Sequence, residues 1–151
     1  RQVQVQPLIN KVTDALVKVY LDKGVKVHAQ LDSDAVFFGD ERDFLEVLGN
    51  ILDNAFKYCD GQVAVTASSL VGSDRGLQIT IEDDGPGISS EKREYVLQRG
   101  ARADTLAQGQ GIGLAVVTDI VASYGGAIEV NKSDLGGARV SLQFDFRRTE
   151  S

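Results

Sequence analysis

The feature that most constrains this chain is residues 81–88, Ile-Glu-Asp-Asp-Gly-Pro-Gly-Ile. They follow an alternating run, residues 77–80, that predicts a strand with one buried face, and counting in twos places Asp83 at the end of its apolar row. A buried carboxylate needs a hydrogen-bonding partner, while Gly85 and Gly87 let the backbone turn sharply and approach a ligand. Asp83 is therefore predicted to anchor a flat, mostly apolar group with a hydrogen-bond donor, such as an adenine ring. The alternative is a hairpin turn with an exposed aspartate.

A helix is predicted over residues 40–58, with Asp40 as its N-cap and Asp43 three residues later, the spacing of a capping box. Its apolar side chains share one broad face, which predicts the core side: Phe44, Leu48, Ile51, Leu52, Ala55 and Phe56. The opposite face carries Glu46, Asn50, Asn54, Lys57 and Tyr58. Asparagine is a poor helix former, so two asparagines one turn apart indicate a face that lines a site. A plainly solvated face is the alternative.

Hydrophobic periodicity predicts the remaining elements. The first helix has Pro7 in its first turn and ends at Gly24, and a strand over 25–31 puts His28 on the polar face as a solvated residue. The other predicted elements are a hairpin of strands 62–68 and 77–83, a short helix over 90–98, a third long helix from Leu114, and closing strands over 127–131 and 139–146. The third long helix is apolar almost all round, which predicts burial between layers.

Residues 99–110 are small and polar with no periodicity, which predicts a mobile lid. The glycine-rich segment 109–113 then opens the third long helix, where free N–H groups and the helix dipole favour phosphate. It follows a loop instead of a strand, so it does not fit a Rossmann fingerprint, and a P-loop is excluded because no Gly-Lys-Ser/Thr occurs.

Composition narrows the class of protein further. A chain of 151 residues predicts one domain, and a net charge of −6 argues against nucleic acid or anionic lipid as a partner. The single cysteine predicts a reducing compartment, and no apolar run reaches membrane-spanning length. Because the chain has no methionine, even at position 1, we expect a piece of a longer protein.

Three motifs, taken together and in this order, carry a family resemblance. The Asn-x-x-x-Asn-x-x-Lys-Tyr helix, the Asp-x-Gly-x-Gly turn and the Gly-x-Gly-x-Gly-Leu segment resemble the catalytic, ATP-binding domain of sensor histidine kinases, within the gyrase, Hsp90, histidine kinase and MutL superfamily. The resemblance covers essentially residues 1–151 as one catalytic domain. It implies an α/β (α+β) two-layer sandwich, the Bergerat fold, in which a mixed sheet of about five strands is covered on one face by three helices beside a mobile ATP lid.

The resemblance also implies a role for each matching position. Asp83 would accept the adenine amino group beside Gly85, with Gly87 and Ile88 against the ring, and Asn54 and Tyr58 would border base and sugar. Three residues would serve catalysis: Asn50 as the Mg²⁺ ligand, Lys57 near the phosphates and Arg102 at the γ-phosphate. Gln110 would be a second metal or phosphate ligand within the phosphate-binding lid segment, which comprises Gly109, Gln110, Gly111, Ile112, Gly113 and Leu114.

The implied reaction uses ATP and Mg²⁺ to phosphorylate a histidine on the protein's own dimerisation domain, followed by relay to a response regulator. His28 lacks the acceptor setting, so that domain would lie upstream. The isolated chain would be a monomer, the intact protein a homodimer, and this domain would be the cytoplasmic part of a bacterial inner-membrane sensor. Two departures concern the lid: Tyr95-Val96-Leu97 stands where the family has phenylalanine, and Ala107-Gln108 stands where a second arginine is usual.

Two other functions remain open. An ATP-hydrolysing clamp of the Hsp90 or gyrase kind would use Glu46, four residues before Asn50, as the base that activates water. The structural alternative for Glu46 is an acid placed favourably near a helix N-terminus. A nucleotide-gated binding module without transfer chemistry is the third possibility, and the intact motifs argue against it.

Overall fold

The computed structural model describes residues 2–70, 75–87 and 112–146, with Ile112 and Gly113 described by backbone alone. The helix predicted over 90–98 and the lid predicted over 99–110 therefore lie outside the described residues.

A five-stranded sheet forms one layer of the domain, in the order β2-β4-β5-β7-β6. Its strands are β2 (Lys26–Leu31), β4 (Gln62–Ser69), β5 (Gly76–Asp83), β6 (Ala127–Lys132) and β7 (Ala138–Asp145). Strand β2 pairs in parallel with β4, whereas the other neighbours are antiparallel, so the predicted mixed sheet of five strands is confirmed. A separate two-stranded sheet joins β1 (Gln2–Gln4) to β3 (Val36–Phe38).

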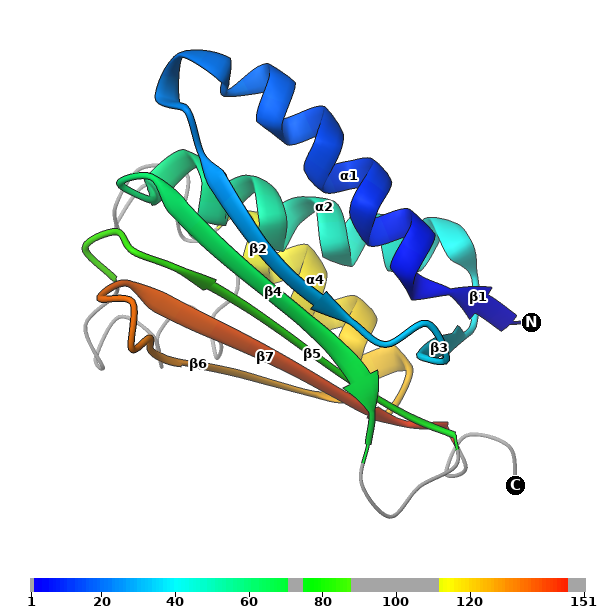
Figure 1. Cartoon of the computed structure of the whole chain (residues 1–151). Helices are drawn as coiled ribbons and strands as arrows, with labels where there is room; N and C mark the ends of the chain where they lie inside the picture. The colour runs from blue at the N-terminus through cyan, green and yellow to red at the C-terminus, as the bar shows by residue number, and fades with distance from the viewer. Residues whose placement is uncertain (1, 71–74, 88–111, 147–151) are drawn as a thin grey trace.

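Three helices cover one face of the sheet, as predicted (Figure 1). They are α1 (Val5–Val19), α2 (Glu41–Tyr58) and α4 (Ile112–Ser123), and the short 3-10 helix η1 (Leu21–Lys23) follows α1. Pro7 is the third residue of α1, where its missing N–H is harmless. Gly24 ends η1 with a φ of 64°, a left-handed conformation that glycine adopts without strain.

Helix α2 lies at the centre of the helical layer, packed against both α1 and α4. All six side chains predicted for its core face are buried, together with Val47. The Asp40 side chain accepts a hydrogen bond from the Arg42 N–H at 2.7 Å, the predicted N-cap. At the other end, the Lys23 ammonium donates to the carbonyls of Phe56 and Lys57 at 2.8 and 2.6 Å. A cation at the carbonyl end of a helix is favourable, so Lys23 stabilises the last turn.

The predicted capping box of α2 has a third participant. Asp43 accepts a hydrogen bond from the Tyr124 hydroxyl at 2.6 Å, and the Tyr124 oxygen accepts one from the Asp40 N–H at 3.1 Å. The hydroxyl thus bridges the two positions that a capping box would join directly, and it fastens the residues after α4 to the start of α2. The Tyr124 ring packs edge-on against Phe37, with 5.0 Å between ring centroids.

The prediction that α4 is buried all round is wrong. Leu114, Val117 and Val121 are buried against the rest of the core, but Val116 is 40% exposed and Asp119 is also exposed. A helix in a layer that covers a sheet has an outer side facing water. Because α4 is largely apolar, its sequence pattern does not identify that exposed side. None of the helices in the described segments combines the length and apolarity needed to cross a bilayer.

We predict that Tyr124→Phe lowers the free energy of unfolding by about 1 kcal/mol, because it removes a hydroxyl that joins α2 to the end of α4 without changing the ring packing. Chemical denaturation of the two proteins measures the difference. Ser123→Ala, which removes an exposed hydroxyl bonded only within its own helix turn in this part of the structure, is the control. Equal losses in both variants would contradict the bridging role.

Candidate nucleotide-binding site

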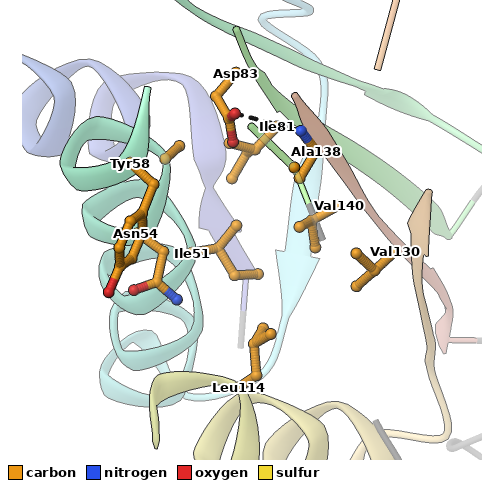
Figure 2. Close-up of a pocket in the computed structure, with 11 residues that line it drawn as sticks. Ile51, Asn54, Tyr58, Ile81, Asp83, Leu114, Val130, Ala138 and Val140 are labelled. Carbon is orange, nitrogen blue, oxygen red and sulfur yellow. Dashed lines mark hydrogen bonds between the residues drawn. The ribbon is translucent and has the colours of Figure 1, made fainter. Parts of the chain in front are cut away.

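Asp83 is the last residue of β5, a strand flanked by β4 and β7. Its side chain is 8% exposed and continues the buried row of Leu77, Ile79 and Ile81, as the alternation predicted. The Asp83 Oδ1 atom accepts a hydrogen bond from the Gly85 N–H at 2.9 Å. It also accepts one from the Ala138 N–H at 3.3 Å, which Figure 2 shows as a dashed line. Two main-chain donors therefore fix the rotation of this carboxylate, and the alternative of an exposed turn aspartate is excluded.

The environment of Asp83 makes ionisation of its carboxyl less favourable than it is in water. Burial raises the pKa of the carboxyl above its ordinary value, the hydrogen bonds from Gly85 and Ala138 act in the opposite direction, and the charges of Asp84 and Asp60 add to the rise. For an aspartate whose folded-state pKa is raised, the unfolded protein ionises first as the pH increases. Folding stability therefore falls between the unfolded and the folded pKa of Asp83, so the ionised group is a cost to the fold.

Glycines allow the main chain to surround Asp83 closely. A Cβ atom at Gly137 would collide with Asp83 Oδ1 and would lie 2.6 Å from both the Asp83 carbonyl oxygen and the Gly85 nitrogen. A Cβ atom at Gly85 would collide with the carbonyl oxygen of Tyr58, and Gly87 has a φ of 75°. These positions require glycine for lack of space at Gly85 and Gly137, and for backbone conformation at Gly87.

Asp84 fixes the turn from the opposite side. Its Oδ1 atom accepts hydrogen bonds from the N–H groups of Asp60, Gly61 and Gln62 at 2.8, 3.0 and 3.0 Å. Burial alone would raise the pKa of Asp84, but these N–H groups stabilise the charged form and hold the pKa below its ordinary value. Asp84 therefore anchors the turn, whereas the neighbouring Asp83 faces the pocket.

An apolar pocket lies between α2, α4 and the sheet, and Asp83 is the charged residue in its lining (Figure 2). The lining includes five residues predicted for the site: Asn54, Tyr58, Asp83, Gly87 and Leu114. It also includes six that the sequence did not assign to the site: Ile51, Ala55, Ile81, Val130, Ala138 and Val140. The first three of these were predicted only as buried residues, and the last three come from β6 and β7.

The side of the pocket formed by β6 and β7 depends on strand register. Ile81 lies opposite Val140 in the β5–β7 pairing, and Val140 lies opposite Val130 in the β6–β7 pairing. No local sequence pattern reveals such pairing. Gly136 and Gly137, just before β7, were nevertheless a signal that another segment of main chain approaches closely, and the prediction did not use it.

Asn50 and Lys57 lie outside this lining. Asn50 is one turn before Asn54 on α2, and its side-chain nitrogen donates to the Glu46 carbonyl at 2.7 Å and to the Glu46 carboxylate at 3.1 Å. Lys57 is exposed, with its ammonium 5.5 Å from the centre of the Tyr58 ring. Asn50 thus lies one helical turn from the pocket residue Asn54, and Lys57 is the neighbour in sequence of the pocket residue Tyr58.

The remaining predicted site residues are only partly covered by the structure. Helix α4 begins at Ile112, two residues before the predicted start at Leu114, so Gly113 and Leu114 both lie in its first turn. Ile88, Arg102, Gly109, Gln110 and Gly111 lie outside the described residues.

The donor set of the described residues fits a magnesium ion shared with a ligand better than a site built by protein alone. In the described part of the chain, no three histidine, cysteine, aspartate or glutamate side chains converge as a metal site. Mg²⁺ commonly takes one or two protein oxygens and completes its shell with water and substrate phosphates. The side-chain oxygen of Asn50, one helical turn from the pocket residue Asn54, is a donor of that kind.

Comparison with known proteins defines the class. Residues 39–148 match the family model described as histidine kinase-, DNA gyrase B-, and HSP90-like ATPase. The chain belongs to this family.

Among curated proteins, the chain is similar to the sensor protein PhoQ of Escherichia coli K12 and to the virulence sensor histidine kinase PhoQ of Salmonella typhimurium LT2. Each is 47% identical over 140 residues, which is 93% of this chain and 28% of the relative. The chain thus spans little more than a quarter of these relatives. Within the family it is an ATP-binding catalytic domain of the sensor histidine kinase type, similar to that of PhoQ, as its motifs indicated.

Solved structures agree with the fold. Full-length ShkA in complex with AMPPNP matches with a TM-score of 0.78 and 25% identity, over 96% of this chain and 30% of that one. The catalytic domain of histidine kinase ThkA matches in fold with a TM-score of 0.83 and 19% identity, over 96% and 94% of the two chains. The predicted two-layer sandwich is therefore confirmed.

We predict that Gly137→Ala abolishes measurable ATP binding and lowers the free energy of unfolding by about 1–3 kcal/mol, because main chain cannot move aside for the added methyl group. Gly61→Ala is the matched control, since its added Cβ would meet no heavy atom within 4 Å beyond its own chain neighbours. Calorimetric ATP titration and chemical denaturation measure the two effects. Wild-type affinity in a folded Gly137→Ala protein would refute the close approach to Asp83.

Proposed function

We propose that this chain is the catalytic domain of a larger, membrane-bound sensor kinase. It supplies the γ-phosphate of ATP to a histidine on the protein's own dimerisation domain, and the phosphoryl group then passes to a response regulator. The intact protein acts as a homodimer at the bacterial inner membrane, with this domain on the cytoplasmic side. The single observation that carries the nucleotide assignment is the orientation of Asp83 in an apolar pocket.

Adenine recognition follows from that orientation. Among the described residues, both hydrogen bonds to the Asp83 carboxylate go to Oδ1. Oδ2 is then the oxygen that accepts the adenine amino group, and the aliphatic residues of the pocket cover the ring faces. A charged acceptor in a pocket that excludes water gives a stronger hydrogen bond than a neutral one.

The residues on α2 receive the rest of the nucleotide. Asn54 and Tyr58 line the pocket beside the base and sugar, and the Lys57 ammonium, above the Tyr58 ring, meets the phosphates. Asn50 binds Mg²⁺ through its side-chain oxygen, and the bound ion supplies neutralisation of phosphate charge. Gln110 and the glycines around it complete the phosphate site, with Gln110 as a second metal or phosphate ligand.

The transfer itself needs little covalent help from the protein. A ring nitrogen of the acceptor histidine forms a bond to the γ-phosphorus while the bond to the β–γ bridging oxygen breaks, and ADP leaves. Arg102 meets charge on the transferring group, so the protein's contribution is positioning and charge stabilisation. His28 is exposed on β2, with its Nε2 atom 3.2 Å from the Gln62 side-chain oxygen. It lies on a strand and lacks the acceptor sequence setting, so the acceptor is a histidine of the dimerisation domain.

Asp83→Asn tests the adenine assignment. The oxygen of the substituted side chain would keep the two main-chain hydrogen bonds, which turns the amide N–H₂ toward the adenine amino group, donor against donor. We expect ATP affinity to fall by about 1.5–3 kcal/mol, roughly 10- to 150-fold. Removing a charge that costs folding stability leaves the variant folded.

The same variant offers an internal control, because inosine triphosphate carries an acceptor oxygen where ATP carries the amino group. The ratio of ATP to inosine triphosphate affinity should therefore reverse in Asp83→Asn, as measured by calorimetry. An unchanged ratio would remove Asp83 from base recognition.

Asn50→Ala tests the metal assignment. We expect nucleotide affinity to drop in Mg²⁺ but to stay close to wild type in a chelator, because the amide oxygen acts through the ion. Competition with a fluorescent nucleotide under both conditions gives the comparison. If the loss is the same in both, Asn50 is not a metal ligand.

Glu46→Gln separates the kinase from the hydrolytic clamp, whose candidate base, Glu46, lies beside Asn50. A glutamine cannot take a proton from water, so a clamp would lose roughly 10²-fold or more of its steady ATP hydrolysis. We expect slow hydrolysis that Glu46→Gln leaves nearly unchanged. Phosphohistidine should form when a histidine-bearing dimerisation domain is added, and rapid Glu46-dependent hydrolysis without it would favour the clamp.

A further inference from the structure

The side chains of Glu46 and Asn50 are in direct contact on the surface of α2. The Asn50 side-chain nitrogen donates one hydrogen to the Glu46 carbonyl at 2.7 Å and the other to the Glu46 carboxylate at 3.1 Å. Both partners can only accept hydrogen bonds. The amide nitrogen must therefore face Glu46, and the amide oxygen must face the opposite way.

The terminal torsion of asparagine does not by itself choose between nitrogen and oxygen. Its rotational preference is broad and roughly two-fold, so a flipped amide is not excluded by side-chain geometry alone. A flip would place the oxygen against a carbonyl and a carboxylate, which is repulsive, and would turn the N–H₂ group outward. A metal ion repels an N–H₂ group, so only the unflipped amide can bind one.

We propose that Glu46 is a positioning residue for metal binding: its carboxylate holds the Asn50 amide with the oxygen presented to the magnesium ion that accompanies ATP. This inference rests on the proposed role of Asn50 as a metal ligand. Glu46 lies four residues before Asn50, the spacing at which side chains on a helix surface meet. Groups that orient metal ligands in this way typically account for 10- to 100-fold in metal affinity.

The hydrogen bond from Asn50 to the Glu46 carbonyl limits how much metal affinity a substitution of Glu46 can remove. The Glu46 carbonyl belongs to the main chain, so one of the two hydrogen bonds survives any substitution at position 46. That carbonyl is also the helical acceptor of the Asn50 main-chain N–H, four residues on. The surviving hydrogen bond to the carbonyl still restrains the amide, although less than two hydrogen bonds do. We therefore expect the loss of metal affinity to lie at the lower end of the range, about 10-fold.

Three variants isolate the hydrogen bond. Glu46→Ala removes both the carboxylate charge and the acceptor, whereas Glu46→Gln removes the charge and keeps an acceptor oxygen. Glu41→Ala is the matched control, because it removes one exposed acid from the first turn of the same helix. The measurement is the Mg²⁺ concentration that gives half of the metal-dependent increase in affinity for a fluorescent ATP analogue.

We expect that concentration to rise about 10-fold in Glu46→Ala, to rise much less in Glu46→Gln, and to stay at the wild-type value in Glu41→Ala. Nucleotide affinity in a chelator should be the same in all four proteins. Equal rises in Glu46→Ala and Glu46→Gln would assign the effect to charge and overturn positioning. A wild-type value in Glu46→Ala would overturn it as well.

A second readout needs neither nucleotide nor metal. In the ligand-free chain, the side-chain N–H₂ resonances of Asn50, assigned with Asn50→Ala, should move upfield and exchange faster with water in Glu46→Ala, but not in Glu41→Ala. Unmoved resonances would refute the hydrogen bond itself. If instead Asn50→Ala shows no Mg²⁺-specific loss while these resonances do move, the metal role in the proposed function fails, and the failure is not in the contact.

Discussion

One buried carboxylate determines much of the architecture around the pocket. Asp83 terminates an apolar row, and burial there is tolerable only because the main chain of Gly85 and Ala138 donates to it. That requirement draws the start of β7 against the end of β5 and demands glycine at position 137. The shape of the pocket and the rotation of the carboxylate thus have a common cause.

The sequence predicted the elements whose signals are local. The amphipathic pattern of α2 and the alternation of β5 and β7 each identify a buried face directly, and the structure confirms them. The prediction for α4 was wrong because its apolar composition hides the side that faces water. The bridging hydroxyl of Tyr124 was missed because its partners lie 81 and 84 residues away along the chain.

In the candidate site, too, only the residues with a local sequence signal were predictable. Asp83, Asn54 and Tyr58 were identified because unusual residues stand on otherwise regular elements. Val130, Ala138 and Val140 resemble ordinary strand residues, and only the register of three strands brings them to the pocket. The roles of Arg102 and Gln110 remain predictions from family resemblance, since both residues lie outside the described part of the chain.

The hydrogen bond from Ala138 to Asp83 spans 55 residues of sequence. A contact of that separation forms only after the intervening chain has closed, which is slow relative to helix formation. Strand β7 therefore has to dock before the Asp83 carboxylate acquires its orientation. A nascent or truncated chain that lacks β7 could build α1 and α2 and still have no affinity for nucleotide, so binding competence marks the completion of folding.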